Sequence, residues 1–582
     1  MTENLFAELR RWVLEEILIL FPELPAEVCA KIEVTPTRDA AHGDMATNAA
    51  LVAAKPAGKN PRDIAAALSQ ALTPRTGIAK AEPAGPGFVN ITLDAEFLLR
   101  QIPVMLTAGE AYGQGADKAE KINVEYVSAN PTGPLHVGHC RGAVVGDALA
   151  NLIAKAGYHV TKEYYINDAG AQVLALGRVV YFRYLQALGL PAKAEAYAGS
   201  VAGGMQYGGA YLEPVGEAFA AEYGGKFIDA PEADWLATAR QFGVAKMLEL
   251  IREDLAALRV YFDIFSSEDA LVQAGGVARG LAILENAGLI YQGVLEPPKG
   301  KTPEDWEPRE QTLFRATAFG DDVDRPVQKS DGSNTYFAND IAYHADKMAR
   351  GFTQMIDVWG ADHGGYVKRM QAAVKALAGN TSANLDVVLC QIVRVMKDGA
   401  PVRMSKRAGT FVELRDLIDE VGPDAVRFIM LMRKSDAQME FDLNAAVAQT
   451  RDNPVFYVQY AHARARSVLR AAGEVSGLAD ADVSSLQAPE ELALIRKLIA
   501  WPRIVETAAQ AREPHRVAFF LYELAGDFHA LWNAGRDDAA LRFLQAERPV
   551  ETKARVALVS ATAIVIRSGL AVLGVQPVEE MR

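Results

Sequence analysis

Apolar residues repeat along this chain with two different periods, which separate it into three regions. Over 4–20 they recur every three or four positions, as on one face of an amphipathic helix, and 61–72 shows the same pattern. A short β-type run at 87–93 follows the turn signal Gly85-Pro86. Because a polar, glycine-containing stretch comes next, residues 1–110 are predicted to form a small α+β domain.

The middle region alternates between β-type runs and helical patterns. A β-type run at 122–127 is followed by a turn rich in proline and glycine and then by a helical stretch. Strand, loop and helix in this order open a doubly wound α/β domain. Loop-like and helical segments then interrupt the rhythm, so we predict an α/β domain at 111–445 with an insertion at about 198–290. Further β-type runs lie at 355–359 and 387–393.

The last region is almost entirely helical in pattern. Its long periodic segments predict an all-helical domain at 446–582. These segments lie at 453–472, 489–511, 515–533 and 550–573.

Size and charge narrow the possible classes of protein. The chain has 582 residues and a mass of 62.9 kDa, which fits several domains. It carries 60 Lys and Arg against 73 Asp and Glu, a net charge of −13, which excludes a uniformly basic coat for nucleic acid. Local basic patches stay open, because net charge is a sum over the whole surface. Residues 451–582 hold 16 basic and 16 acidic residues, so the surplus of acid lies in the first 450.

Cysteine content and apolar runs bear on the compartment. Cys29, Cys140 and Cys390 lie far apart and form no CxxC pair, which is typical of a reducing compartment and suggests no bound metal. The N-terminal segment is amphipathic and charged, unlike a signal peptide. The longest apolar run, 556–566, is too short to span a bilayer. We therefore expect a soluble cytoplasmic protein with no membrane partner.

The most specific local pattern is His136-Val137-Gly138-His139, which stands where a β-type run gives way to a helix. A helix N-terminus offers free N–H groups and a positive dipole end, which suit a phosphate. The glycine permits close approach of a ligand, and the imidazoles can donate hydrogen bonds to a triphosphate. Two other interpretations are half a metal site, with no third ligand nearby, and an accidental pair of surface histidines.

A second pattern, Arg403-Met404-Ser405-Lys406, follows the β-type run at 387–393 and a turn at Asp398-Gly399. A basic loop of this kind can bring one ammonium to a phosphate as a point charge. Taken alone, the pattern is more typical of a solvated basic loop.

Together the two patterns resemble the double signature of class I aminoacyl-tRNA synthetases, which carry HIGH-like and KMSKS-like motifs on a Rossmann catalytic domain. Arg403 stands where the second motif has its first lysine, and Lys406 matches the lysine that the family uses on the phosphates. Other segments are similar to bacterial arginyl-tRNA synthetases and extend the resemblance over nearly the whole chain. They are 124–136, 164–170, 335–344, 358–363, 424–428 and 453–464.

The resemblance implies a fold and a set of functional residues. The fold is a Rossmann-like class I synthetase catalytic domain with an insertion, a small N-terminal α+β domain that binds the tRNA D-loop, and a C-terminal helical domain that binds the anticodon. The implied catalytic residues are His136, His139 and Lys406. The implied ATP-binding residues are His136, Gly138, His139, Gly360, Asp362, Met404, Ser405 and Lys406. The implied arginine-binding residues are Glu125, Ser128, Asn130, His136, Tyr336, Asp340 and Asp362.

The chemistry of arginine agrees with this pocket. A guanidinium is a planar fork of donors, which calls for carboxylates and carbonyl groups around it. Asp340 lies four residues after Tyr336, so both point the same way on a helix. We expect Asp340 to be the main guanidinium partner, with Glu125 and Asn130 near the α-amino and carboxylate end. Apart from the resemblance, Asp340 could also be a helix cap or part of a surface ion pair.

Two places resemble the tRNA-binding parts of the family. Phe88 and Asn90 are alternate residues of one strand and face the same side, where an aromatic ring can stack on a base beside an amide that reads its edge. Tyr457, Tyr460 and Arg464 lie on the first helix of the last region and suit a single-stranded loop. The alternatives are a core phenylalanine with a turn asparagine, and a helix that packs its tyrosines and solvates its arginines.

The resemblance therefore implies ATP-dependent attachment of L-arginine to tRNA(Arg) through arginyl-adenylate, with Mg²⁺ entering with ATP, no tightly bound cofactor and a monomeric enzyme. It also implies that activation needs tRNA. Two other classes stay open: a nucleotidyltransferase that shares the HIGH-like phosphate site, and a non-catalytic tRNA-binding paralogue. The first would not need the N-terminal and C-terminal regions, and the second would be expected to lose His136, His139 or Lys406.

Overall fold

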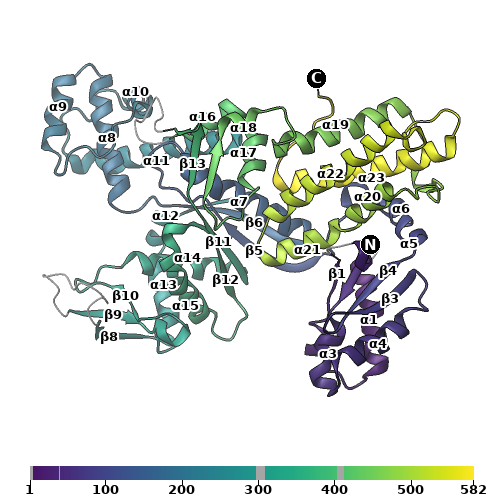
Figure 1. Cartoon of the computed structure of the whole chain (residues 1–582). Coiled ribbons are helices and arrows are strands. Elements are labelled where there is room, and N and C mark those ends of the chain that lie inside the picture. Colours follow the sequence, from purple (N-terminus) through teal and green to yellow (C-terminus); the bar gives the residue numbers. More distant parts are fainter. Residues whose placement is uncertain (1–3, 38–39, 296–308, 403–411, 582) are drawn as a thin grey trace.

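A parallel β-sheet lies in the middle of the molecule, and the other units are arranged around it (Figure 1). The structure is a computed structural model, and it describes residues 4–37, 40–295, 309–402 and 412–581. Two units lie on one side of the sheet. One comprises the helices α8–α11, within 171–257, and the other contains the strands β8–β10, within 290–328. The N-terminal unit and the C-terminal helices lie on the other side.

The central sheet has five parallel strands in the order β12-β11-β5-β6-β7. The strand order reverses between β5 and β11, which makes this the topological switch point, where open α/β sheets bind ligands. The strands are β5 (Lys118–Glu125), β6 (Tyr158–Ile166), β7 (Ile264–Ser267), β11 (Gln354–Gly360) and β12 (Asn384–Cys390). A doubly wound α/β domain is thus confirmed.

The two faces of the sheet differ in chemistry because successive residues of a strand point to opposite sides. Val124 and Ile356 pack in the same apolar core as the helix α7 (Val137–Lys155). Their neighbours Glu125 and Asp357 point to the other face, which is covered by α14 (Tyr336–Ala349) and α15 (Val367–Ala378). One face is therefore an ordinary apolar core, and the other carries buried charge.

The N-terminal unit is an antiparallel sheet in the order β1-β2-β4-β3, backed by helices. Val89, Ile91 and Leu93 of β4 are buried under these helices. Its elements are α1 (Leu5–Leu20), α2 (Ala26–Cys29), β1 (Val34–Pro36), β2 (Met45–Thr47), α3 (Ala49–Ala57), α4 (Pro61–Leu72), β3 (Ile78–Ala84) and β4 (Phe88–Leu93). The next helices, α5 (Ala95–Leu99) and α6 (Gln101–Ala108), pack on the C-terminal helices α20 and α23 instead.

Two units interrupt the parallel sheet, where the sequence predicts one insertion at about 198–290. The first is helical and has its own core, with Tyr181 stacked on Trp235 at 3.8 Å between ring centroids. The second is an antiparallel sheet in the order β10-β9-β8. The strand β7 falls within the predicted range but belongs to the central sheet, because four residues carry too little pattern to stand out from the helices around them.

These two units contain the following elements. The helical one comprises α8 (Ala171–Ala187), α9 (Pro191–Ser200), α10 (Glu213–Tyr223) and α11 (Glu232–Ala257). The other comprises α12 (Glu268–Gln273), α13 (Gly276–Asn286), β8 (Ile290–Val294), β9 (Glu310–Phe314) and β10 (Arg325–Gln328).

A small three-stranded sheet lies between the central parallel sheet and the last helices in the chain. Its order is β14-β13-β15, and Asp398 and Gly399 turn the chain between β13 and β14 with φ of 52° and 74°. Its elements are β13 (Val393–Lys397), β14 (Ala400–Pro401), α16 (Leu414–Val421), α17 (Pro423–Met430), β15 (Met439–Asp442) and α18 (Leu443–Val447).

The C-terminal helices match the predicted segments, with one break. The pattern at 489–511 is two helices, because Pro502 starts the second and has no N–H to continue the first. The helices are α19 (Pro454–Ala472), α20 (Pro489–Ile499), α21 (Trp501–Ala511), α22 (His515–Asp537) and α23 (Pro549–Leu573). Single 3₁₀ turns lie at 40–42, 109–111, 210–212, 316–319, 361–366, 478–480 and 539–541.

The helix α23 extends well beyond the apolar run predicted at 556–566. By length and composition it could cross a membrane, with a mean hydropathy of 2.1 over its best 18 residues. However, 78% of that stretch is buried against α7, α19 and α22. Its composition is therefore that of a core helix.

Candidate active site

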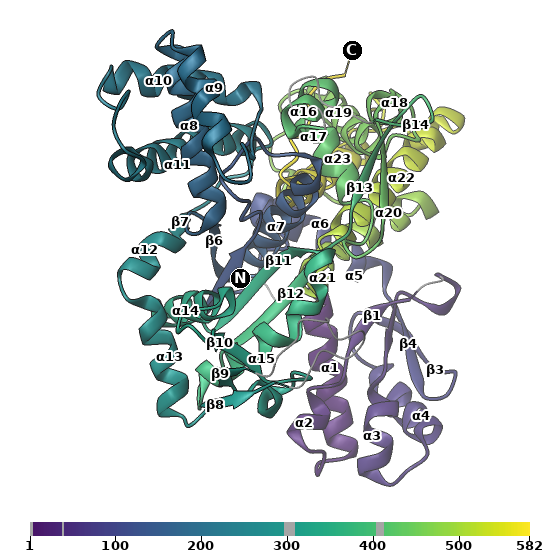
Figure 2. The same cartoon turned by 90° about the vertical axis from the view of Figure 1, so that its left-hand side faces the viewer.

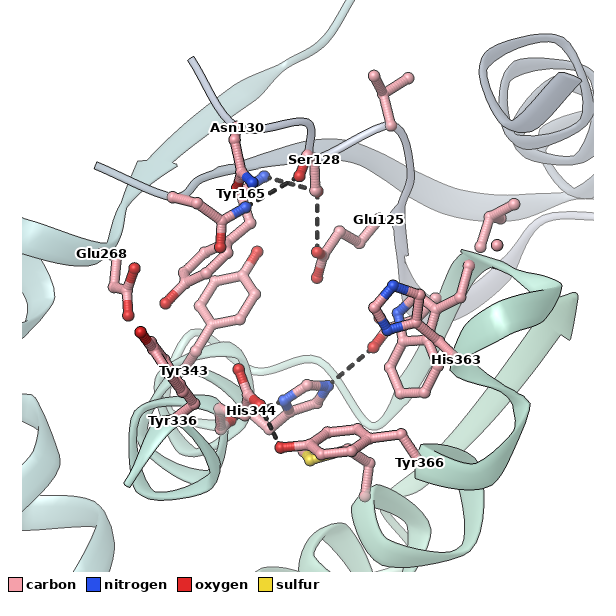
Figure 3. A pocket seen from close by; sticks show the side chains of 18 of the residues that line it. Glu125, Ser128, Asn130, Tyr165, Glu268, Tyr336, Tyr343, His344, His363 and Tyr366 are labelled. Carbon is pink, nitrogen blue, oxygen red and sulfur yellow. Dashed lines mark hydrogen bonds and ion pairs between the residues drawn. The ribbon is translucent and has the colours of Figure 1, made fainter. Parts of the chain in front are cut away.

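A cavity of about 480 Å³ lies at the switch point, where the carboxyl ends of β5 and β11 meet (Figure 3). This volume lies within the usual range for small-molecule sites. Glu125 and Ser128 line one side, His344 and Tyr366 the opposite side, and Glu268 and Tyr336 one end, with His363 at the other end. The cavity brings together these predicted residues: Glu125, Ser128, Asn130, Tyr336, Asp340 and Gly360.

The loop that follows Glu125 at the end of β5 has a strained backbone at Val127 and Ser128. Val127 and Ser128 have φ of 69° and 41°, and a β-branched residue rarely adopts such values. The turn brings the Ser128 hydroxyl within 2.9 Å of Glu125 Oε1, to which it donates, while it accepts the N–H of Tyr165 at 3.0 Å. Strain of this kind is found where a loop must aim functional groups.

Two carboxylates line the opposite wall and end of the cavity. The Tyr366 hydroxyl donates to Asp340 Oδ2 at 2.6 Å, and Asn339 Nδ2 donates to Glu268 Oε1 at 2.8 Å. Burial raises the pKa of Asp340 to about 6, although the Tyr366 hydrogen bond opposes this. Burial also raises the pKa of Glu268. Both carboxyl groups are therefore partly desolvated and would gain from a cationic ligand.

Glu268 was missed by the sequence analysis. It lies at the start of α12, directly after the short strand β7, which the sequence pattern did not reveal. Locating β7 would have shown that Glu268 follows a carboxyl end of the sheet, as Glu125 and Gly360 do. The sequence analysis also missed the aromatic rings of Tyr165 and Tyr343, whose centroids lie 4.2 Å apart in the cavity wall. Here the reason is that no local sequence pattern marks a residue that lines a cavity.

Tyr336 and Asn130 are the more accessible members of the lining. The Tyr336 side chain is 76% exposed at the start of α14, four residues before Asp340. Asn130 is exposed and donates to Gln172 Oε1 at 2.7 Å. Both can therefore contact a ligand at the mouth of the cavity.

His136 and His139 cap the N-terminus of α7. His136 Nδ1 accepts the N–H of Gly138 at 3.0 Å, and His139 Nδ1 accepts the N–H of His136 at 3.3 Å. Burial lowers the pKa of both rings, that of His139 to about 4, so both are neutral near pH 7. Because each Nδ1 is an acceptor, the proton of each neutral ring is on Nε2, which can donate to an anion.

Gly138 is required for this arrangement. A Cβ at this position would lie 2.7 Å from Cε1 and 2.8 Å from Nδ1 of the His136 ring, so any other residue would displace the ring from its cap. The spacing of the HIGH-like motif is thus explained by local geometry. Within the described part of the chain, no group of three or more His, Cys, Asp or Glu is placed to hold a metal ion.

The chain that follows the basic loop is paired with the start of α7. Val137 donates its N–H to the carbonyl of Val412 at 2.9 Å, and Leu414 donates to Leu135 at 2.9 Å. Residues 403–411, which include the predicted Met404, Ser405 and Lys406, lie outside the described residues. The described end of this segment nevertheless lies beside the two histidines.

Gly360 and Asp362, at the end of β11, are placed differently. Gly360 lines the cavity together with His363. The Asp362 side chain is 81% exposed, pairs with His363 at 3.5 Å and does not line the cavity. The structure therefore does not bring Asp362 to Glu125 and Asp340, with which it is predicted to form the amino-acid pocket.

Comparisons with known proteins identify the family of this chain. Residues 8–93 match the family described as the arginyl tRNA synthetase N terminal domain, 101–187 and 309–465 match the tRNA synthetases class I (R) catalytic domain, and 458–581 match the DALR anticodon binding domain. The arginine–tRNA ligase of Gluconobacter oxydans is 56% identical over 595 residues, covering 100% of this chain and 98% of its own. That of Cereibacter sphaeroides is 55% identical over 589 residues and covers all of both chains.

The chain belongs to the arginyl-tRNA synthetase family.

Solved structures of the family share the fold of this enzyme. The arginyl-tRNA synthetase of Thermus thermophilus superposes with a TM-score of 0.76 at 24% identity, over 99% of this chain and 100% of that one. The enzyme of Plasmodium falciparum gives 0.73 at 16% identity over the whole of both chains. The predicted fold class, with small N-terminal, Rossmann-like catalytic and helical C-terminal parts, is thus confirmed.

In the N-terminal part of the enzyme, Phe88 and Asn90 share the outer face of β4. Phe88 is 38% exposed, whereas Val89 and Ile91 between and beyond them are buried. Phe88 is therefore not a core residue, which was the main alternative to an RNA-facing role.

In the C-terminal part, Tyr457, Tyr460 and Arg464 line one cavity of about 860 Å³. The Arg464 guanidinium lies 4.2 Å from the centroid of the Tyr460 ring and donates from Nη1 to His529 Nδ1 at 3.1 Å. Burial lowers the pKa of His529 to about 4, so the ring accepts this hydrogen bond in its neutral form. The three residues thus form one half-buried surface with a fixed cation, rather than separate surface side chains.

Proposed function

We propose that the cavity binds L-arginine with its guanidinium between Asp340 and Glu268 and its α-ammonium beside Glu125 and Asn130. The activity of the enzyme is the ATP-dependent attachment of L-arginine to tRNA in protein synthesis. The observation that carries the assignment is the pair of partly desolvated carboxylates, Asp340 and Glu268, that line the cavity at the switch point of the sheet. A carboxylate pair suits the planar fork of a guanidinium better than the single ammonium of lysine.

In this arrangement the arginine carboxylate attacks the α-phosphorus of ATP in line, and pyrophosphate leaves. The ribose 2′-OH of the terminal adenosine of tRNA then attacks the carbonyl carbon of arginyl-adenylate, the acyl–phosphate bond breaks and AMP leaves. No side chain acts as a nucleophile, so catalysis consists of positioning and of stabilising charge on the phosphates. Mg²⁺ enters with ATP as part of the substrate.

His136 and His139 donate from Nε2 to the triphosphate at the N-terminus of α7. Two neutral donors and the helix dipole stabilise the negative charge on the phosphates. A buried cation at the same place would bind ATP equally well before the reaction and so would not favour the transition state. We assign Lys406, Ser405 and Met404 to the opposite side of the triphosphate, and Gly360 and Asp362 to the adenosine. The support for the first of these is that Val412 and Leu414, just after the loop, pair with the start of α7.

The remaining assignments concern the tRNA and the assembly. Residues 1–110 would bind the D-loop through Phe88 and Asn90, and 446–582 the anticodon through Tyr457, Tyr460 and Arg464. We further propose that 111–445 is the catalytic domain and that the enzyme is a cytoplasmic monomer.

ATP–pyrophosphate exchange with arginine, run with and without tRNA, tests the proposal. Exchange should depend on arginine and on tRNA, and Lys406→Ala should reduce it on the order of 10²–10³-fold while arginine binding changes little. Near-normal exchange in that variant would refute the role of Lys406. Exchange with lysine as efficient as with arginine would refute the carboxylate pair.

A further inference from the structure

Three neighbouring strands place a row of carboxylates on the α14 face of the central sheet. In the strand register, Asp357 of β11 is opposite Glu125 of β5, and Glu125 is opposite Glu163 of β6. All three are buried, at 1%, 7% and 0% exposure. Adjacent strands are about 4.8 Å apart, so three carboxylates in such a row repel one another strongly unless cations are interposed.

The helix α14 supplies two cations, Lys347 and Arg350, and one imidazole, His344, from one face. These side chains are spaced three residues apart, and each contacts a carboxylate of the row. Arg350 pairs with Glu163 through Nη1 and Nη2 at 3.0 and 2.8 Å. His344 Nε2 lies 3.1 Å from Asp357 Oδ2, and its Nδ1 lies 2.8 Å from the carbonyl oxygen of Asp340.

Lys347 occupies the gap between the two carboxylates that line the cavity. Its side chain is 0% exposed, and Nζ donates to Glu125 Oε2 at 2.6 Å and to Asp357 Oδ1 at 3.1 Å. The ammonium also lies 4.5 Å from the centroid of the Tyr343 ring. Its donors are thus directed at two anions and a π face, and Lys347 itself does not line the cavity.

We propose that Lys347 is a positioning residue that keeps Glu125 ionised and directed into the cavity, and that it thereby sets the affinity for the α-ammonium of arginine. The proposal rests on the role given above to Glu125. Glu125 Oε2 is committed to Lys347, while Oε1 accepts only the Ser128 hydroxyl within the described contacts and faces the cavity. Removing the ammonium would leave Glu125 and Asp357 side by side without a shared cation.

The titratable groups around Glu125 define the direction of the effect. Lys347 and His344 of α14 favour its ionised form, and Asp357 of β11 opposes it. Burial raises the pKa of Glu125, and the attraction of Lys347 is the largest influence that lowers it. Other groups that face Glu125 are Asp340 and Tyr343 of α14 and Tyr165 and Glu163 of β6. Without Lys347, Glu125 should take up a proton at a higher pH than in the native enzyme and so lose its attraction for an ammonium more readily.

A pair of ligands isolates this effect from general damage. L-arginine and 5-guanidinopentanoate share the guanidinium and the carboxylate, but only arginine has the α-ammonium. The ratio of their dissociation constants, measured by calorimetry, therefore cancels changes at Asp340 and Glu268. In the native enzyme the ratio should favour arginine by about tenfold or more, the usual range for a hydrogen bond to a charged group.

In Lys347→Met the preference for arginine should fall to within about threefold of unity when Glu125 is protonated and recover as the pH rises, because only ionised Glu125 attracts the ammonium. In Glu125→Gln it should be lost at every pH, and adding Lys347→Met to Glu125→Gln should change it no further. Lys368→Met, which removes an exposed lysine of α15 paired with Asp322, should keep the native ratio. A native ratio in Lys347→Met, beside a lowered ratio in Glu125→Gln, would overturn the proposal.

Two further comparisons keep the result interpretable. If Lys347→Met fails to fold, Asp357→Asn and Asp357→Asn with Lys347→Met can be compared, since neither leaves two acids without a cation. The double variant should prefer arginine less than the single one, and equal ratios would overturn the proposal. A native ratio in Glu125→Gln would instead refute the proposed role of Glu125 and leave Lys347 a purely structural residue.

Discussion

Asp340→Asn is the sharpest test of how the cavity recognises its substrate. The substitution preserves shape and the hydrogen bond from the Tyr366 hydroxyl, which donates at 2.6 Å, but removes the charge that faces the guanidinium. A hydrogen bond to a charged group contributes roughly 1.5–3 kcal/mol, so the dissociation constant of arginine should rise about 10–150-fold. Because Glu268 remains as a second carboxylate, we expect the lower half of this range.

The kinetic signature separates binding from chemistry. Asp340 lies in the cavity and not at the histidine-capped end of α7, so the variant should raise KM for arginine in tRNA-dependent ATP–pyrophosphate exchange and leave kcat nearly unchanged. Asp322→Asn, at an exposed residue paired with Lys368, is the matched control and should behave as the native enzyme. An unchanged KM in Asp340→Asn, or a loss confined to kcat, would refute the assignment.

The pH dependence gives an independent check on the same residue. Burial raises the pKa of Asp340 to about 6, and a guanidinium binds the ionised carboxylate. Arginine affinity should therefore be full above pH 7 and fall as the pH drops through 6, by up to about tenfold per unit. Asp340→Asn should lack this step, and a native-like step in the variant would assign the titration to another group.

Three other outcomes follow from the geometry. Gly138→Ala puts a Cβ 2.7 Å from the His136 ring, so exchange should fall on the order of 10²-fold or more with arginine binding intact; native exchange would contradict the cap. Phe88→Ala removes a 38% exposed ring, so KM for tRNA should rise by the equivalent of about 1–3 kcal/mol with no change in thermal stability, and a lowered Tm with native KM would identify a structural residue instead. Arg427→Met removes the fully buried one of two cations paired with Asp147, leaving Lys162, and breaks hydrogen bonds to Leu573 and Leu258, so unfolding should become easier by about 3 kcal/mol, whereas exposed Arg470→Met should be neutral in thermal melts; equal Tm values would contradict the role of Arg427.

Periodicity alone predicted the long elements of this fold well. The helix α4 has the predicted bounds, 61–72, because an apolar face and a proline at its first turn mark it clearly. The break at Ala500 and the four-residue strand β7 were missed, since a short element or a single proline inside a helical pattern changes the period very little. The insertion was therefore predicted as one segment although the structure has two units on either side of β7.

The candidate site was predicted where residues follow long strands and missed where they follow short ones. Glu125 and Gly360 end β5 and β11 and were predicted with the help of the family resemblance, whereas Glu268 follows β7 and was not. Lys347 was missed for a different reason: on its own helix it reads as an ordinary surface lysine. Only the register of β5, β6 and β11 reveals the row of acids that requires it.

The most direct test of the central claim is a crystal structure of the enzyme with a non-hydrolysable analogue of arginyl-adenylate. We predict the guanidinium within hydrogen-bonding distance of both Asp340 and Glu268, the α-ammonium at Glu125, and the phosphate-like group near His136 and His139. A guanidinium bound elsewhere, or turned away from both carboxylates, would contradict the account.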